Sequence, residues 1–223
     1  MEPLIRIEGR AVPLPRANVD TDTIIRIEHL MDADPANLRE HAFATLRRRA
    51  DGTPDPACPF NQDTYRDAPI LITGANFGCG SSREHAVWAL RAIGIRCVFA
   101  AGFGDIFRNN CFQNGVLAIT LPAAEIARLF VEATPHGDFQ VDLAACRVST
   151  PSGREFAFEV DAWRRQRLLQ GLDDLAYLLT MAPEIARWQA EDRVRRPWVW
   201  AVSAGPGAEA AVEGACRVPE NNP

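Results

Sequence analysis

Residues 76–85 carry the side chains best suited to chemistry. They read Asn-Phe-Gly-Cys-Gly-Ser-Ser-Arg-Glu-His, between an apolar stretch at 70–73 and a helical pattern that follows. Gly78 and Gly80 let a ligand approach the backbone closely, and the free N–H groups at the start of a helix bind anions. Arg83 falls in the predicted first turn, where a cation is unfavourable unless an anion is shared with the helix. The segment therefore predicts an anion site, in which the guanidinium grips a carboxylate with two bonds.

Three residues of this segment also have simpler interpretations. Ser81 and Glu84 have the spacing of a capping box, in which case Ser81 only ties down the helix start. His85 either orients the site or packs as an ordinary core histidine. Cys79 is either a reactive thiol or a non-catalytic residue that lines the site. The second is favoured, because the sequence fixes no base beside it.

Several classes of enzyme are excluded by what the sequence lacks. All 24 basic residues are arginines, so no lysine can form a Schiff base or complete a Walker A phosphate loop. The Rossmann fingerprint fails because its third glycine position is Arg83, and no G-x-S-x-G nucleophile elbow surrounds either serine. The net charge of −5 argues against a nucleic-acid partner.

The cysteines and the hydropathy pattern indicate the compartment in which the chain works and whether it binds a metal. None of the six cysteines forms a C-x-x-C pair, so we expect no metal site or self-contained iron–sulfur cluster in this chain. The N-terminus has no pattern of a secretory signal, and no window of 18 apolar residues occurs. We therefore expect a cytoplasmic protein with reduced cysteines and no contact with a membrane.

The elements that position residues 76–85 are predicted to alternate between strand and helix. This β-α-β-α-β-α order implies a partly parallel sheet with right-handed crossovers. The predicted strands are 70–73, 97–101 and 116–121, and the predicted helices are 82–93, 105–112 and 123–133. Short strands follow at 139–143, 146–149 and 155–160, and then helices at 162–170, 173–179 and 183–193.

The two ends of the chain look different from this middle. Residues 5–15 predict one strand, residues 18–25 an acidic turn, and residues 34–50 a helix with Asp34 as its N-cap. Residues 51–69 form a long irregular connection, a feature that is often functional. We expect a single domain over residues 1–202.

Beyond residue 200 the composition changes to Ala, Gly, Pro and Glu, and residues 203–223 predict a disordered tail. Just before it lies an apolar cluster of Trp188, Trp198 and Trp200. The sequence leaves open whether this cluster belongs to a core or to an interface.

Three motifs together resemble a known family. Residues 18–25 (Asn-Val-Asp-Thr-Asp-Thr-Ile-Ile), residues 76–85 and residues 105–115 are similar to the 3-isopropylmalate dehydratase small subunits, relatives of the swivelling domain of aconitase. The likeness continues through 158–161 and 171–174 and covers roughly residues 3–200. It implies an α/β fold, the swivelling β/β/α domain of the aconitase C-terminus, with a partly parallel sheet and flanking helices.

The resemblance also implies an activity. Members of the family interconvert 2- and 3-isopropylmalate by dehydration and rehydration, a step of leucine synthesis, together with a large subunit that carries a [4Fe–4S] cluster. Ser81 would be the catalytic base, and Ser82, Arg83 and Gly80 would bind the dicarboxylate substrate. Asp22 would face the same cleft.

This sequence departs from the family pattern at two places, and these leave alternatives open. Arg26 and Ile27 follow the 18–25 motif where Pro-Lys is usual, and Val87 stands where proline is common. A related dehydratase acting on citramalate, citraconate or dimethylmalate is the first alternative. The others are a free-standing dicarboxylate-binding module and a thiol enzyme that uses Cys79.

Overall fold

The structure, a computed structural model, describes residues 1–29, 35–81 and 83–201. The chain divides into two compact units, Met1–Tyr177 and Leu178–Pro223. The single domain expected over residues 1–202 stays a prediction, and the predicted tail at 203–223 lies outside the described residues.

A parallel sheet forms the centre of the first unit. Its strands follow the order β2-β3-β4-β5, and every neighbouring pair is parallel. The register aligns Ala11 with Ile70, Ile70 with Cys97, and Cys97 with Leu117. All four residues of β3 and of β4 are buried, as expected for strands covered on both faces. The bounds are β2 Ala11–Leu14, β3 Ile70–Thr73, β4 Cys97–Ala100 and β5 Leu117–Thr120.

A second sheet is antiparallel and has the order β1-β6-β7-β8. Its strands are β1 Arg6–Gly9, β6 Phe139–Asp142, β7 Arg147–Ser149 and β8 Glu155–Ala157. The single strand predicted for residues 5–15 is wrong, because the chain changes sheet between β1 and β2. The break falls at Gly9, whose φ of 145° is open only to glycine and whose added Cβ would meet the Pro69 ring at 2.9 Å.

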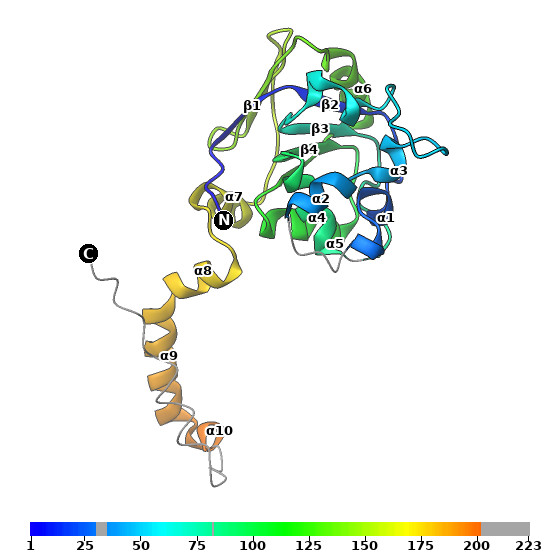
Figure 1. Cartoon of the computed structure of the whole chain (residues 1–223). Helices are drawn as coiled ribbons and strands as arrows, with labels where there is room; N and C mark the ends of the chain where they lie inside the picture. Colours follow the sequence, from blue (N-terminus) through cyan, green and yellow to red (C-terminus); the bar gives the residue numbers. More distant parts are fainter. Residues whose placement is uncertain (30–34, 82, 202–223) are drawn as a thin grey trace, which may run out of the picture. The chain divides into compact units, whose positions relative to one another are not determined.

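Helices cover both faces of the parallel sheet. Figure 1 shows α6 on one side of the sheet, and α2 and α4 on the other. This arrangement is a mixed α/β fold, and the predicted strand–helix alternation from residue 70 onward is confirmed within one to three residues at the element ends. The helices of this part are α4 Glu84–Ala92, α5 Asp105–Gln113 and α6 Ala123–Glu132, followed by α7 Ala162–Gln170 and α8 Asp174–Thr180.

The predicted helix at 34–50 is divided in two. The structure has α2 Pro35–His41 and α3 Ala44–Arg47, separated by Phe43 at a φ of 53°. The N–H of Phe43 donates 2.8 Å to the Ile24 carbonyl instead of continuing the helix, and its buried ring stacks on Phe60. Tertiary contacts therefore override the helical periodicity. The predicted N-cap Asp34 lies outside the described residues.

The remaining N-terminal segments are short. The acidic turn predicted at 18–25 contains a helix, α1 Thr21–Ile24, with Asp20 as its N-cap. A 3₁₀ turn, η1 Ile27–His29, follows α1. The irregular connection at 51–69 holds two further 3₁₀ turns, η2 Pro59–Asn61 and η3 Asp63–Tyr65.

The described part of the second unit consists of the end of α8 and the helices α9 Ala182–Arg195 and α10 Pro197–Trp200. Trp188 and Trp198 are 52% and 70% exposed, so they do not belong to a core. Trp200 donates 3.0 Å to Asp192, which Arg195 and Arg196 also bind. The interface alternative for this cluster stays a prediction.

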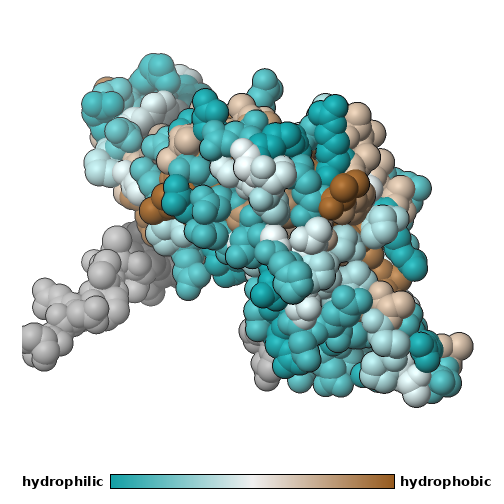
Figure 2. All heavy atoms as spheres, turned by 90° about the horizontal axis from the view of Figure 1, so that it is seen from above, coloured by the Kyte–Doolittle hydropathy of each residue, from teal (hydrophilic) through white to brown (hydrophobic). Residues whose placement is uncertain are grey.

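The face of the chain seen from above is mainly polar. Figure 2 shows a mostly hydrophilic face on which hydrophobic side chains occur in small separate groups. Among the described residues, no helix is both long and apolar enough to cross a bilayer.

Candidate functional site

Three loops meet at the carboxyl end of the parallel sheet, where ligands bind in open α/β folds. They follow β2, β3 and β4, and backbone hydrogen bonds join them. In the loop after β3, the Gly78 N–H donates to the Val19 carbonyl at 2.7 Å, and the Cys79 carbonyl accepts from the Thr21 N–H at 3.0 Å. On its other side, the Phe77 N–H donates to Gly102 at 2.9 Å. The predicted site segment is therefore the middle of three interlocked loops.

Gly78 is the position where this arrangement is tightest. Its φ is 71°, and an added Cβ would lie 2.1 Å from the Phe107 ring carbon Cγ. Phe107 is buried on α5 and packs edge-on against Phe77. Only glycine lets the loop cross α5 at this distance. The predicted reason for a glycine here, the close approach of a ligand to the backbone, stays a prediction.

A pocket of about 320 Å³ opens between this loop and the start of α5. Gly78, Cys79, Gly80 and Ser81 form one wall, and residues 104–107 form the other. Gly80 and Ser81 are exposed, and Gly80 has a φ of 88°. The pocket has the size of a small organic acid and presents backbone groups of two loops to it.

Arg83, two residues after Ser81, forms an ion pair with Asp22. Arg83 Nη1 donates to Asp22 Oδ1, joining residues that are 61 positions apart in the chain. The Arg83 side chain is only 13% exposed, whereas that of Asp22 is 52% exposed. The guanidinium is thus held in place with part of its donor fork unused by Asp22, which suits it to a second carboxylate.

The helix after this loop begins later than predicted. α4 starts at Glu84, and Arg83 is its N-cap with an extended backbone and no side-chain cap. The capping-box interpretation is therefore wrong: Glu84 accepts from Asn114 Nδ2 at 2.7 Å, and Ser81 precedes the N-cap by two residues. Arg83 also lies just before the first turn rather than in it, and the N–H groups of that turn are left without a side-chain cap.

Thr21 is a site residue that the sequence analysis missed. Its hydroxyl donates 2.9 Å to the Ser81 carbonyl, and the residue is 1% exposed. The signal available in the sequence was its place inside the 18–25 motif, between Asp20 and Asp22. Asp105 and Ile106 were missed as well, and they line the pocket opposite Ser81 because the β4–α5 loop folds against the β3–α4 loop.

The supporting residues lie close to the loop but differ in role. His85 is half-buried, and its ring packs 4.4 Å from the Trp88 ring along α4. Cys79 is half-buried in the pocket wall, and no histidine or carboxylate is hydrogen-bonded to it in the described chain. Ser82 lies outside the described residues.

The described residues do not fit an iron–sulfur cluster. In the part of the chain that the structure describes, no group of three or more His, Cys, Asp or Glu side chains is arranged so that it could hold a metal ion. Cys97 and Cys111 are fully buried, and this burial raises the pKa of both thiols, which disfavours the thiolates that a metal needs.

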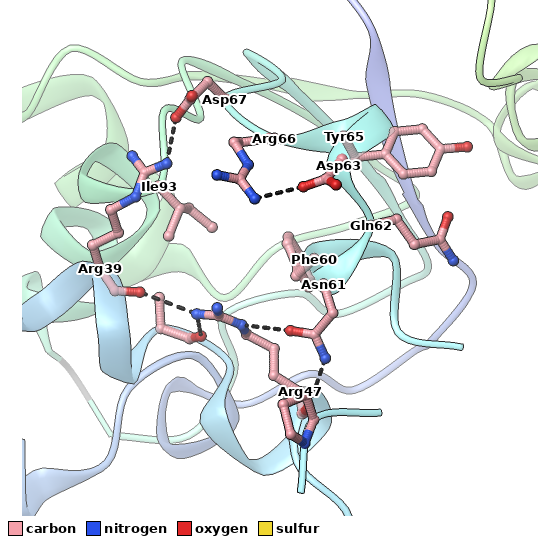
Figure 3. Close-up of a pocket in the computed structure, with 12 residues that line it drawn as sticks. Arg39, Arg47, Phe60, Asn61, Gln62, Asp63, Tyr65, Arg66, Asp67 and Ile93 are labelled. Atoms are coloured by element: carbon pink, nitrogen blue, oxygen red, sulfur yellow. Dashed lines mark hydrogen bonds and ion pairs between the residues drawn. The ribbon is translucent and has the colours of Figure 1, made fainter. Parts of the chain in front are cut away.

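A second cavity, of about 410 Å³, lies beside α2 and the 51–69 connection. Figure 3 shows that its arginines are engaged by the protein itself. Arg39 pairs with Asp67, and Arg66 pairs with Asp63, each at 2.5 Å. Arg47 donates 3.1 Å to Asn61 and also to carbonyls at the end of α2. These contacts fasten the long connection to α2, which is a structural role for it.

Comparison with known proteins gives consistent matches over most of the chain. The sequence profile of the aconitase C-terminal domain matches residues 1–124, and a profile described as LeuD_N matches residues 127–162. The 3-isopropylmalate dehydratase small subunit of Dechloromonas aromatica is 44% identical over 211 residues, covering 90% of this chain and all of that protein. The small subunit of Sinorhizobium fredii is 42% identical over 200 residues, covering 89% of this chain and all of that protein.

A solved structure agrees with these matches. The 3-isopropylmalate dehydratase structure from Methanocaldococcus jannaschii has a TM-score of 0.62 and 27% identity, covering 82% of this chain and 99% of that one. The fold and the profile match thus define a domain of the aconitase C-terminal class. Within that class, the chain belongs to the family of 3-isopropylmalate dehydratase small subunits. The family and the fold predicted from the sequence are confirmed.

Proposed function

We propose that this chain is the cytoplasmic small subunit of a hydro-lyase that interconverts 2- and 3-isopropylmalate in leucine synthesis. The observation that carries the proposal is the interlocked loop pair, in which Asp22 holds Arg83 beside the Gly78–Ser81 wall. Such a pocket suits a substrate with several carboxylates, because fixed donors stabilise the extra negative charge that builds up during proton removal. The names of the relatives agree with this substrate.

Each site residue has a defined task in the proposal. Arg83 binds a substrate carboxylate with the guanidinium N–H groups that Asp22 leaves free, and Ser82 and Gly80 bind the same carboxylate. Ser81 Oγ, as an alkoxide, takes the proton from the carbon next to a carboxylate while the substrate hydroxyl leaves. In the second half of the reaction, Ser81 gives a proton to the carbon that lost the hydroxyl, while water adds at the carbon that lost its proton, so that the hydroxyl has moved to the neighbouring carbon.

The geometry around Ser81 supports this task. Thr21 fixes the Ser81 carbonyl from one side, so the exposed hydroxyl stands on a backbone that two loops hold. The guanidinium of Arg83 and the uncapped N–H groups of α4 follow within three residues, and they would favour an alkoxide at Ser81. A hydroxyl is a weak base in water, so this positive surrounding is a requirement of the mechanism.

The proposal places the [4Fe–4S] cluster on the large subunit, because the described residues of this chain do not fit one. This chain then provides half of an active site, and its large subunit provides the group that polarises the leaving hydroxyl. The experiment is to combine the purified chain with the large subunit of the same organism and to assay dehydration. Activity only in the mixture is expected. Activity of either chain alone would contradict the proposal that the two subunits share one active site.

The alternative substrates differ from isopropylmalate in the group on the malate carbon. The segment in which the sequence departs from its family, at Arg26 and Ile27, is exposed next to α1, and Ile27 is 62% exposed. Rates with 3-isopropylmalate, citraconate and dimethylmalate should be compared in the assembled enzyme. A kcat/KM at least about 10-fold higher for 3-isopropylmalate supports the proposal, and a higher value for another acid replaces it.

The free-standing module makes a different prediction. A binding module needs no partner, so the chain alone would bind citrate or malate tightly. In our proposal the isolated chain binds these acids only weakly, because half of the ligand surface belongs to the other subunit. Calorimetric titration of the chain with citrate, before and after addition of the large subunit, distinguishes the binding module from the enzyme subunit. Tight binding by the chain alone would favour the module.

A further inference from the structure

The strongest feature outside the site is a cavity of about 590 Å³ at the far end of α4. Its volume is within the range of small-molecule sites. It shares no lining residue with the pocket beside Ser81, and it lies entirely within the first unit. Its walls come from α2, from the last turns of α4 and from the segment that leads into β4.

Arginine side chains form one side of this cavity. Arg91 is half-buried, and its side chain has no ion pair or hydrogen bond within the described part of the chain. Burial, followed by the nearby positive charge of Arg96, lowers the pKa of Arg91. The Arg96 side chain is 24% exposed, and its Nη1 forms an ion pair with Glu2 Oε2 at 3.1 Å. The Glu2 side chain is 80% exposed. Among the described residues that line the cavity, two arginines face the single, exposed carboxylate of Glu2, so positive charge is in excess there.

The other side of the cavity is hydrocarbon. Leu38 is buried on α2, and Trp88 and Ala92 line the wall from α4. The Trp88 indole is fixed, since its Nε1 donates 2.9 Å to Asn114 Oδ1. A purely polar anion would leave this wall uncovered, whereas a ligand with a carboxylate at one end and a branched alkyl group at the other would satisfy both sides.

Arg91 also has a structural explanation, because it occupies the last turn of α4, where a cation interacts well with the helix. That interaction accounts for the sign of its charge. It does not provide partners for the guanidinium N–H groups, and it does not account for a second arginine on the same cavity.

We propose that this cavity binds a small monocarboxylate with a branched apolar body, with its carboxylate on Arg91 and its alkyl group against Trp88 and Leu38. The site is separate from the substrate pocket. An occupant would nevertheless be connected to it, because Asn114 binds both Trp88 and Glu84, the residue that follows Arg83.

The test is calorimetric titration of the full chain with 4-methylpentanoate. Two control ligands are titrated in the same way: 4-methylpentanamide, which lacks the charge, and inorganic phosphate, which lacks the alkyl group. We expect one saturable site for the carboxylate, and at least about 10-fold weaker binding of both control ligands. No saturable binding up to about 20 mM, or equal binding of the amide or of phosphate, would overturn the proposal.

Variants locate the binding. Arg91→Gln should weaken the carboxylate at least about 10-fold, and Arg91→Lys should fall between that variant and the wild type. Arg128→Gln, which changes an exposed arginine on α6, is the matched control and should bind as the wild type does. Arg83→Gln should also bind normally, which separates this cavity from the substrate pocket. Binding that survives Arg91→Gln and Arg91→Lys, or is lost in Arg83→Gln, contradicts the assignment.

Discussion

Asp22 and Arg83 form an ion pair that joins the α1 start to the α4 start, across 61 positions of the sequence. The pair links two of the motifs that carry the family resemblance, and it defines how the arginine is presented. Because the Arg83 side chain is mostly buried while Asp22 is half-exposed, Asp22 acts as the group that orients the guanidinium.

Replacing this carboxylate should therefore weaken substrate binding. In the assembled enzyme, Asp22→Asn is expected to raise KM about 10-fold with a smaller change in kcat, because Arg83 loses its orienting charge. Asp22→Glu should recover part of the loss. Steady-state kinetics of the three proteins measure this. An unchanged KM in Asp22→Asn would contradict the orienting role, and a lowered KM would show that Asp22 competes with the substrate for Arg83.

Gly78 offers a test of the loop geometry. Gly78→Ala should destabilise the chain by about 2–4 kcal/mol, since a methyl group would overlap the Phe107 ring in addition to the strained φ. Gly153→Ala is the matched control, with a φ of 81° and no atom within 4 Å of the added Cβ. It should cost only about 1 kcal/mol, the effect of the backbone alone. Similar urea midpoints for the two variants would refute the predicted close contact.

An acidic group away from the site governs part of the acid stability. Burial alone would raise the pKa of Glu132, but hydrogen bonds from Ser152, Thr150 and Arg154, together with the charge of Arg154, lower it to about 2 from an ordinary 4.5. A lowered folded-state pKa gives stability that is complete above about 4.5 and disappears as the pH falls toward 2.

Glu132→Gln should consequently be less stable at pH 7 by about 1–3 kcal/mol. Its free energy of unfolding should also fall less steeply than that of the wild type between pH 5 and pH 2. Urea unfolding at several pH values in this window makes the comparison. Parallel pH profiles for the two proteins would mean that this carboxylate is not the titrating group.

The sequence predicted the central part of the fold well, for a physical reason. The strands at 70–73 and 97–100 are apolar except for Thr73, and the neighbouring helices have clear boundaries at Gly94 and Pro122, so local patterns and tertiary contacts agree. The N-terminal third was harder. A change of sheet at Gly9 and the helix break at Phe43 both depend on partners that are distant in the sequence.

The site was predictable in composition but not in its connections. The glycines, Ser81 and Arg83 mark an anion site by residue type, and the structure places them at the sheet edge. The pairing of Arg83 with Asp22 and the bond from Thr21 to Ser81 span some 60 residues, and no local pattern encodes them. The supposed capping box failed for the same reason, because Asn114, a distant residue, binds Glu84.

The thiol of Cys79 is predicted to be dispensable. Cys79 contributes its backbone to the pocket and its carbonyl to Thr21, and alanine preserves both. We expect Cys79→Ala to keep kcat/KM within about 3-fold of the wild type in the assembled enzyme. A loss of about 100-fold or more would instead favour the thiol enzyme.

The most direct test of the proposed function is the rate of the assembled enzyme carrying Ser81→Ala. Dehydration of 3-isopropylmalate by the variant with its large subunit should be slower by about 10²–10⁴-fold in kcat, with KM nearly unchanged, because the base is lost while Arg83 and Asp22 remain. Exchange of the substrate C–H proton with deuterated water should fall in parallel. Wild-type turnover and exchange in the Ser81→Ala enzyme would contradict the assignment of Ser81 as the base.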